Sequence, residues 1–269
     1  MPYLFDYFNR VRGLLSLAPL GLFTDIDGTI SEIAPSPAEA RVSPACRESL
    51  AVLAEHLALV AAVSGRPAAE ARRMVGIDEL VYIGNHGYER WCGGSVELVP
   101  GAGGYIAEIK RALDELRGVI SIEGVLLENK GCTASIHYRL CRDPEAAREA
   151  ITSAVERLAG ARGLRVSQGK MTVELRPPLE VSKWTAVRSL IREHGLSGVI
   201  YLGDDLTDVD VFLAFQQEDL AFKGLTIGIL GQETAPDVAC QADFTLNGVG
   251  DVERFLKQVA AEAADRPVP

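Results

Sequence analysis

The sequence lacks the features that would place the protein in a membrane, outside the cell or on a nucleic acid. No apolar run reaches the roughly 18 residues that a membrane-spanning helix requires, and Asp6 and Arg10 interrupt the apolar N-terminal stretch, which does not suit a secretory signal. Positive charge is scarce, since 27 Lys and Arg stand against 37 Asp and Glu. Nucleic-acid binding rests largely on Lys and Arg. We therefore expect a cytoplasmic protein with no nucleic-acid and no membrane partner.

Cysteine is also sparse and forms no pattern. The five cysteines are scattered, odd in number and without metal-ligand spacing, so we expect buried or free thiols rather than disulfides or a zinc site. With 48% hydrophobic and 24% charged residues, the composition is typical of a globular protein. A length of 269 residues allows one large domain or a core with a smaller inserted module.

Strands and helices alternate in the first hundred residues and again after residue 179. Short apolar runs are typical of buried parallel strands, and helices between them show apolar residues at three- and four-residue spacing. The predicted strands are 20–27, 58–65, 80–87, 198–205, 224–230 and 242–246, and the predicted helices include 44–56, 67–75 and a helix from Ser182. This alternation predicts an α/β fold with a doubly wound, Rossmann-like parallel-sheet core formed by residues 1–100 and 179–269.

The pattern changes between residues 101 and 178. Helices at 104–117 and 144–158 each precede a pair of strands, at 125–131 with 132–140 and at 164–168 with 171–177, the last pair joined by Gly169 and Lys170. The α-β-β-α-β-β order predicts an α+β cap domain inserted into the core. Glycine pairs at 93–94 and 103–104 and the proline pair at 177–178 are interpreted as hinges that bracket it.

The most informative motif is TDIDGT, which places Asp25 and Asp27 at the end of the first predicted strand. The chain turns there, so one carboxylate can attack a substrate while the other serves as acid or base. An aspartate can accept a phosphoryl group and then lose it to water, which divides one difficult displacement into two easier ones. The motif also fits an ordinary strand-end turn with capping carboxylates, and further groups are needed to decide.

Two of these groups lie at other predicted strand or helix ends. Ser64 and Arg66 follow the second strand, where a hydroxyl and backbone N–H groups beside a helix start can hold phosphate oxygens. Lys183 begins a helix, where a cation gains nothing from the helix dipole and can instead face an anion. Each signal alone also fits a cap or a solvated lysine.

A third group is acidic. The strand at 198–205 ends in Asp204 and Asp205, and Asp208 follows one turn later. Such a run needs a cation nearby, and Mg2+ takes oxygen ligands from carboxylates, carbonyls, water and phosphate. In an open parallel sheet the carboxyl-end loops meet at one crevice. The sequence therefore predicts that Asp25, Asp27, Ser64, Lys183 and Asp204 converge at one site, and that this site binds Mg2+.

This set of motifs, in this order, resembles the haloacid dehalogenase superfamily of phosphotransferases across essentially the whole core. The resemblance implies that Asp25 is nucleophile and metal ligand, and that Asp27 is the general acid and base, with its main-chain carbonyl on the metal. It also implies that Ser64 and Lys183 bind the phosphoryl group. Asp204 would complete the metal site, with Asp205 and Asp208 as outer partners that orient ligands and waters.

Short motifs in the insertion narrow the resemblance to the trehalose-6-phosphate phosphatases. They are Glu-x-Lys at 128–130, His-Tyr-Arg at 137–139, Gly-Lys followed by Glu-x-Arg-Pro at 169–177, and a core His-Gly-x-Glu at 86–89. Similarity implies a substrate-binding set from the cap and the core, in which all but Arg66 face the sugar: Arg66, Asn85, His86, Glu128, Lys130, Arg139, Lys170 and Glu174. Alternation in MTVELRP puts Thr172, Glu174 and Arg176 on one face. Trp184 stands where the family usually has glycine after the lysine.

The expected function is that of a magnesium-dependent phosphatase, acting as a monomer on a small sugar phosphate, with trehalose 6-phosphate as the first candidate. A phosphomannomutase-like hexose phosphomutase combines the same core motifs with a related cap. Phosphatases of mannosyl- or glucosylglycerate phosphate or of a glucosylglycerol phosphate would differ only in the cap. A phospho-receiver domain or a sugar-binding regulatory protein is the alternative without catalysis, although Asp27 and the long insertion disfavour the receiver.

Overall fold

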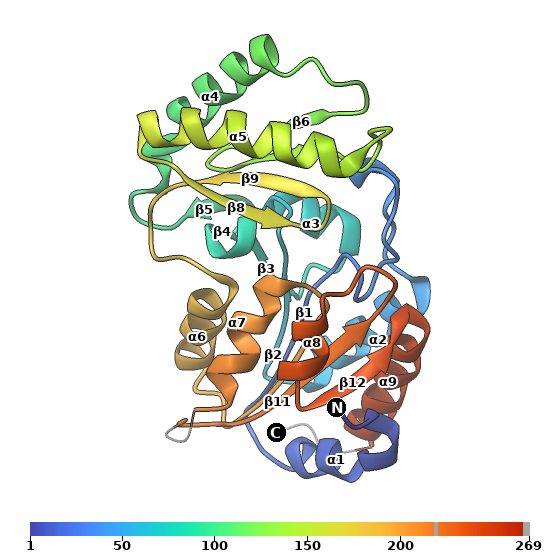
Figure 1. Ribbon diagram of the computed structural model, residues 1–269. Helices are drawn as coiled ribbons and strands as arrows, with labels where there is room; N and C mark the ends of the chain where they lie inside the picture. The colour runs from blue at the N-terminus through green and yellow to red at the C-terminus, as the bar shows by residue number, and fades with distance from the viewer. Residues whose placement is uncertain (218–219, 266–269) are drawn as a thin grey trace. The chain divides into compact units, whose positions relative to one another are not determined.

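The computed structural model describes residues 1–217 and 220–265, and the chain forms two compact units (Figure 1). The core unit consists of Met1–Glu97 and Val181–Pro269, and the cap unit of Leu98–Glu180. The boundaries at residues 101 and 178 stay a prediction of where independent domains divide.

The core unit is built on an eight-stranded sheet in the order β12-β11-β10-β1-β2-β3-β4-β5. Every pair from β12 to β3 is parallel, which confirms the doubly wound core. β1 lies between β10 and β2, with Thr24 level with Leu202 and Ala62, and all five of its residues are buried. The strands are β1 (Leu20–Thr24), β2 (Leu59–Val63), β3 (Val81–Gly84), β4 (Glu89–Cys92), β5 (Ser95–Leu98), β10 (Gly198–Gly203), β11 (Lys223–Leu230) and β12 (Phe244–Asn247).

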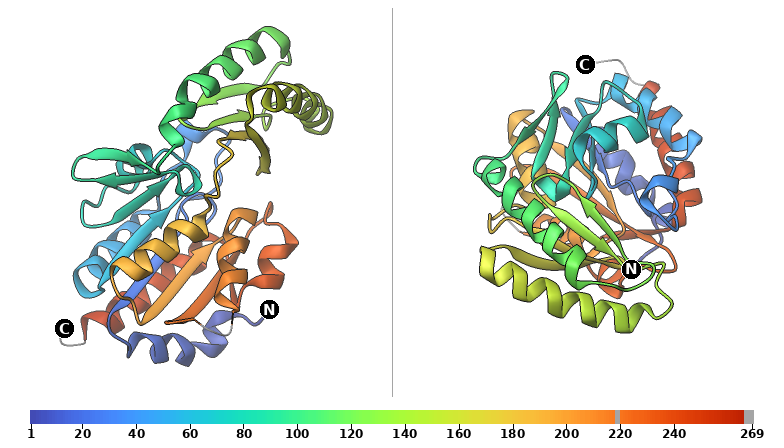
Figure 2. Two further views of the ribbon diagram at one scale, coloured as in Figure 1. Left: turned by 90° about the vertical axis from the view of Figure 1, so that its left-hand side faces the viewer. Right: turned by 90° about the horizontal axis from the view of Figure 1, so that it is seen from above.

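Helices cover both faces of this sheet and bury two separate apolar clusters. One cluster includes Leu50, Val75 and Phe255 from the helices α2, α3 and α9, and the other includes Leu190, Phe212 and Val238 from α6, α7 and α8 (Figures 1 and 2). The helices are α1 (Asn9–Leu15), α2 (Pro44–His56), α3 (Ala68–Val75), α6 (Lys183–Glu193), α7 (Leu206–Phe215), α8 (Pro236–Gln241) and α9 (Gly248–Ala264), with short 3-10 turns at Leu4–Tyr7, Pro37–Glu39 and Asn85–Gly87.

The edge strands β4 and β5 were not predicted, and the glycine pair at 93–94 is not a hinge. β4 pairs antiparallel with β3, and β5 lies beside β4 at the sheet edge. Gly93 and Gly94 join the two strands, with φ of 55° and 92°, a conformation that glycine adopts without steric cost. Both strands are short and partly exposed, so they carry no continuous apolar run by which the sequence could reveal them.

The cap unit is an open-faced sheet with its helices on one face (Figures 1 and 2). Its strands follow the order β6-β7-β9-β8, and all neighbours are antiparallel. Its elements are a 3-10 turn at Ala102–Tyr105, α4 (Ile106–Val119), β6 (Leu126–Asn129), β7 (Ala134–His137), α5 (Pro144–Arg162), β8 (Arg165–Gly169) and β9 (Thr172–Arg176). The hairpin turn is at Lys170 and Met171 rather than Gly169 and Lys170, because Gly169 pairs with Thr172 inside the ladder.

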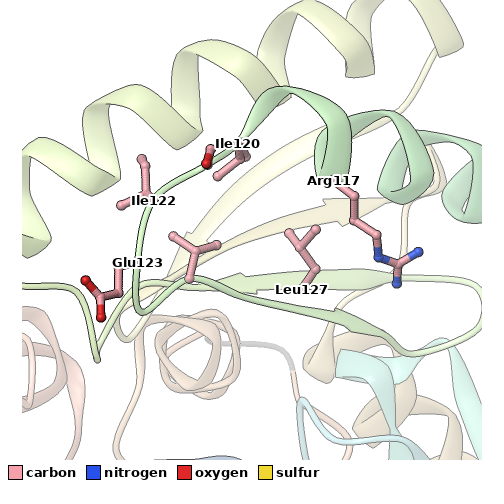
Figure 3. Close-up of a pocket in the computed structure, with 7 residues that line it drawn as sticks. Arg117, Ile120, Ile122, Glu123 and Leu127 are labelled. Atoms are coloured by element: carbon pink, nitrogen blue, oxygen red, sulfur yellow. The ribbon is translucent and has the colours of Figure 1, made fainter.

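A pocket of the cap unit lies at the end of α4 and beside β6 (Figure 3). Its lining mixes apolar side chains with a few polar ones: Arg117, Ile120, Ser121, Ile122, Glu123, Val125 and Leu127. Leu127 alternates with Glu128 on β6, so the pocket lies on the opposite side of the strand from the predicted sugar-binding carboxylate.

The cysteines and the apolar helices can be followed into the structure. The five cysteines are free thiols, with Cys46, Cys132 and Cys141 buried and Cys92 and Cys240 exposed. Among the helices that the structure describes, none is both long enough and apolar enough to cross a membrane.

Candidate active site

Asp25 lies at the carboxyl end of β1, at the centre of the sheet. Its backbone N–H donates to the Leu202 carbonyl at 2.9 Å, which continues the pairing with β10, and its side chain is buried. Burial raises the pKa of Asp25 well above its ordinary value. The Lys183 ammonium lowers this pKa, whereas the carboxylates of Asp208, Asp204 and Asp27 raise it further. An aspartate in this position needs positive charge beside it to be an ionised nucleophile.

Lys183 supplies such a charge from the first turn of α6. Ser182 caps this helix through a capping box with Thr185, which fixes the backbone on which the lysine stands. The Nζ atom lies 2.9 Å from Asp25 Oδ1 and 2.7 Å from Asp208 Oδ1, and the whole side chain is buried. Burial alone would lower the pKa of Lys183, but the charges of Asp208 and Asp25 outweigh it and raise the pKa. Lys183 thus faces two carboxylates, and its contact with a phosphoryl group stays a prediction.

Asp204 follows β10 and completes an acidic cluster with Asp25 and Asp208. Carboxylate oxygens of the three buried residues lie within 4.8 Å of one another. The loop after β1 packs directly on Asp204, because a Cβ atom on Gly28 would stand only 1.7 Å from Asp204 Oδ2. Only a glycine fits there, and its φ of 86° also favours glycine.

Buried carboxylates outnumber the cations beside them in this cluster, and carboxylate oxygens are the ligands that Mg2+ prefers. The donor set therefore fits a divalent cation held by Asp25 and Asp204. Asp208 differs from these two, because both its oxygens already accept hydrogen bonds from protein groups.

Asp27 is paired with Arg66 rather than with Lys183. Arg66 Nε donates to Asp27 Oδ2 at 2.6 Å and Nη2 donates to Asp27 Oδ1 at 2.8 Å, a two-point ion pair between the loops after β1 and β2. The remaining contacts of the guanidinium are to the Pro37 carbonyl and to Glu70. Since the guanidinium is engaged in these contacts, the sequence-based assignment of Arg66 to substrate stays a prediction, and its observed contact is with the proposed acid and base.

Ser64 and the residues after β3 form a second part of the site. Ser64 Oγ accepts from the Arg66 N–H at 3.2 Å, and its carbonyl accepts from the His86 N–H at 2.9 Å. Asn85 and His86 have positive φ values of 48° and 58°, a backbone conformation that is uncommon for residues other than glycine but that Asn and His adopt more often than most. A Cβ on Gly65 would lie 2.6 Å from the His86 ring, so the loops after β2 and β3 touch.

Glu89 holds this backbone in place. One carboxylate oxygen accepts from Asn85 Nδ2 at 2.7 Å and the other from the Ala68 N–H at the start of α3. Gly87 in turn packs on the Ser182 carbonyl next to Lys183, because an added Cβ would lie 2.5 Å from that oxygen. Contacts thus run from the β1 loop through the β2 and β3 loops to α6, and they bring the predicted core residues together.

The predicted cap residues divide into strand and turn positions. Glu128, Ser135, Glu174 and Ser167 lie level with one another across the four strands, which confirms that Glu174 faces away from Val173 and Leu175. Val173 and Leu175 are fully buried on the helix side. The polar face of the cap sheet is therefore the face that carries Glu128 and Glu174.

Both carboxylates on this face are held by neighbours. Glu174 accepts from Ser135 Oγ at 3.3 Å and from Arg176 Nε at 2.9 Å. Glu128 lies 2.7 Å from His137 Nε2 and 3.8 Å from Lys130 Nζ. Preorganised carboxylates of this kind suit sugar hydroxyls, which donate and accept hydrogen bonds.

Arg139 and Lys170 are not in strands. Arg139 lies in the turn after β7 and Lys170 in the turn between β8 and β9, and both are partly exposed. Their assignment to the sugar stays a prediction.

Trp184, the departure from the family pattern, packs in the apolar part of the core unit. Its ring packs edge-on against Phe215 at 5.9 Å between centroids, within the apolar cluster of α6 and α7.

Sequence reasoning missed Tyr201, and it named Glu89 only as part of the His-Gly-x-Glu motif without giving it a role. Tyr201 is a buried residue of β10 whose hydroxyl donates to Asp208 Oδ1 at 2.6 Å. The only signal of Tyr201 in the sequence was its hydroxyl group within an otherwise apolar strand. Asp208, expected as an outer partner, accepts from Lys183 and from the backbone N–H groups of Asp204 and Asp205.

The chain matches a family model and several known proteins over most of its length. A family model described as Trehalose-phosphatase matches residues 23–249. The chain is 33% identical over 272 residues to a trehalose-phosphate phosphatase of Mycobacterium marinum, covering 97% of this chain and 66% of the relative. It is 32% identical over 271 residues to an uncharacterized glycosyl hydrolase of Mycobacterium tuberculosis, covering 97% of this chain and 20% of that protein.

A solved structure agrees with these sequence matches. The crystal structure of a trehalose-6-phosphate phosphatase related protein superposes with a TM-score of 0.77 at 25% identity, covering 92% of this chain and 100% of that one. The chain spans a fifth of the M. tuberculosis relative and about two thirds of the M. marinum relative.

Proposed function

Because the chain belongs to the trehalose-phosphatase family, we propose that it is a phosphoric monoester hydrolase that converts trehalose 6-phosphate to trehalose and phosphate. The observation that carries the proposal is the Asp25 carboxylate at the end of the central strand, 2.9 Å from the buried Lys183 ammonium and within the same acidic cluster as Asp204. Phosphoryl transfer through an aspartate requires a nucleophilic carboxylate, a fixed cation and a second carboxylate. All three lie here at the carboxyl ends of the parallel strands.

In the first step an Asp25 carboxylate oxygen attacks phosphorus. A bond forms between this oxygen and phosphorus, the bond between phosphorus and the sugar oxygen breaks, and Asp27 gives a proton to the departing oxygen. Lys183 offsets the negative charge of the phosphoryl oxygens, and Ser64 donates a hydrogen bond to one of them. The two-point pair with Arg66 has to release one Asp27 oxygen before that oxygen can reach the leaving group.

In the second step Asp27 takes a proton from water, the water oxygen attacks phosphorus, and the bond to Asp25 breaks to release inorganic phosphate. Asp25, Asp204 and the main-chain carbonyl of Asp27 would hold Mg2+, which supplies positive charge against the phosphate oxygens when bound.

The polar face of the cap sheet is proposed to recognise the sugar. Glu128 and Glu174 are fixed acceptors, and Lys130, Arg139 and Lys170 are donors, so together they match hydroxyl groups that both donate and accept. Asn85 and His86 are proposed to contact the sugar from the core unit. We propose that the protein acts as a monomer on this small substrate.

The test is a phosphate-release screen against trehalose 6-phosphate, glucose 6-phosphate, mannose phosphates and glycosylglycerate phosphates, with and without MgCl2. Trehalose 6-phosphate should be preferred by orders of magnitude, and omission of Mg2+ should abolish turnover. Isomerisation of a hexose phosphate that depends on a sugar bisphosphate would instead reveal a mutase. A single phosphorylation of Asp25 without repeated hydrolysis would reveal a receiver.

A further inference from the structure

Asp208 is a fully buried carboxylate of the core unit that accepts four hydrogen bonds from protein groups. Its Oδ2 atom accepts from the backbone N–H groups of Asp204 at 3.2 Å and Asp205 at 3.1 Å. Its Oδ1 atom accepts from Lys183 Nζ at 2.7 Å and from the Tyr201 hydroxyl at 2.6 Å. A carboxylate offers about four acceptor sites, so protein donors occupy the capacity of this side chain. Asp208 therefore binds its protein neighbours and has little acceptor capacity left for a metal or a substrate.

The packing around Asp208 is equally specific. A Cβ on Gly203 would stand 2.3 Å from Asp208 Cγ, so the strand end accepts the carboxylate only because residue 203 has no side chain. Asp208 is fully buried. This packing fixes the Asp208 carboxylate beside Lys183. The strength of the hydrogen bond between Asp208 Oδ1 and the Lys183 ammonium then depends on the other donor to the same oxygen.

Tyr201 is that other donor. It lies in the middle of β10, fully buried, with its ring edge-on to Phe212 at 6.1 Å and Phe215 at 6.5 Å. A phenylalanine would fill the same space and keep both ring contacts. What the hydroxyl adds is the bond to Asp208 Oδ1, the oxygen that also binds Lys183.

We propose that Tyr201 is a positioning residue for the reaction, because its hydroxyl shares Asp208 Oδ1 with Lys183 and so leaves the ammonium charge available to Asp25 and the phosphoryl group. This inference rests on the proposed function of the site. Two donors on one acceptor oxygen each receive a weaker bond than one donor alone. Without the hydroxyl, Asp208 binds Lys183 more strongly and draws its charge away from the reacting phosphate.

The experiment compares Tyr201→Phe with Tyr82→Phe. Tyr82 is a matched control, since it is also fully buried in a strand of the same sheet, β3, and its hydroxyl donates to the Ile77 carbonyl at 2.5 Å, outside the site. Tyr201→Phe loses the hydroxyl bond to Asp208, and Tyr82→Phe loses two bonds, because the Tyr82 hydroxyl also accepts from the Ile77 N–H at 3.3 Å. Measured quantities are kcat and KM for trehalose 6-phosphate and the affinity for orthovanadate, a phosphate mimic without a sugar, by calorimetry in MgCl2.

For Tyr201→Phe we expect kcat and vanadate affinity each to fall on the order of tenfold, with KM nearly unchanged because the sugar contacts are untouched. For Tyr82→Phe both quantities should match the wild type, even where its unfolding temperature falls. Wild-type kcat and vanadate affinity in Tyr201→Phe, or equal losses in the two variants, would overturn the inference. Should Tyr201→Phe fail to fold, 3-fluorotyrosine at position 201 provides a stronger donor and should tighten vanadate binding, and unchanged binding would contradict the proposal.

The readouts separate this inference from the proposed function. If the wild type hydrolyses no sugar phosphate but binds vanadate more tightly than Tyr201→Phe does, the proposed function fails and the role of Tyr201 stands. If the wild type hydrolyses trehalose 6-phosphate and Tyr201→Phe equals it in kcat and vanadate affinity, the function stands and the role of Tyr201 fails. A wild type that neither turns over substrate nor binds vanadate contradicts both.

Discussion

Replacing Lys183 with methionine tests the electrostatics of the site through stability as well as activity. The substitution keeps an unbranched side chain of similar length but removes a buried cation that lies 2.9 Å from Asp25 and 2.7 Å from Asp208. Removing one partner of a buried ion pair costs about 3–5 kcal/mol, because a buried charge is left without compensation. For a chain of this size each kcal/mol lowers the unfolding temperature by about 2–4 °C, so we expect a fall of roughly 10 °C.

The loss should also depend on pH, and its sign follows from Asp25. Burial raises the pKa of this carboxyl, and Lys183 lowers it again. A carboxyl whose pKa is higher in the folded than in the unfolded state adds stability below its ordinary pKa and loses that contribution as the pH rises through the folded-state value. Without Lys183 the folded-state pKa of Asp25 is higher, so the pH range over which this stability is lost extends to higher pH. The deficit of the variant relative to wild type should then grow from pH 5 to pH 8, by up to about 1.4 kcal/mol per pH unit.

Thermal unfolding followed by circular dichroism at pH 5 and pH 8, without added metal, measures both effects. Lys257→Met on the exposed face of α9 is the control and should shift the unfolding temperature by no more than a degree or two at either pH. An unfolding temperature for Lys183→Met equal to wild type at pH 8, or a deficit that shrinks as the pH rises, would refute the assignment of a compensated buried charge cluster.

Three further predictions follow. Mg2+ at about 100 times its dissociation constant should stabilise the wild type by about 2.7 kcal/mol, and Asp204→Asn should abolish the thermal shift; a shift that survives would place the cation elsewhere. Glu174→Gln, which weakens the contact with Arg176, should lower kcat/KM for trehalose 6-phosphate by about 10- to 100-fold and leave turnover of a small aryl phosphate unchanged; equal losses on both substrates would argue against sugar recognition. Trp184→Phe should lower the unfolding temperature but keep kcat/KM near wild type, since the ring packs on Phe215; a large loss of kcat/KM would mean that this side chain supports the site.

Much of the core could be predicted because its signals are local. The helix Pro44–His56 was predicted with the bounds observed, since Ser43 Oγ accepts from the Cys46 N–H and Pro44 suits the first turn. α5 runs to Arg162, beyond the predicted end at 158, because Gly163, in a left-handed conformation, ends it and Gly160 does not. The parallel strands were recognisable as continuous apolar runs.

The part of the site that the sequence could not reveal depends on pairings between distant residues. Arg66 and Asp27 are 39 positions apart and meet only because β1 and β2 are neighbours. Tyr201 resembles an ordinary core aromatic until α7 brings Asp208 back over the strand end. β4 and β5 were missed because their partly exposed residues and a glycine pair favoured a hinge.

The central claim is that Asp25 carries the phosphoryl group during turnover. It is tested most directly by mixing enzyme with trehalose 6-phosphate and Mg2+, quenching in acid within the first turnovers, and locating phosphate by mass spectrometry of the peptides. The account predicts a phosphoryl group on Asp25 in the wild type, and neither phosphorylated peptide nor phosphate release in a folded Asp25→Asn variant. Substantial phosphate release by that folded variant would contradict it.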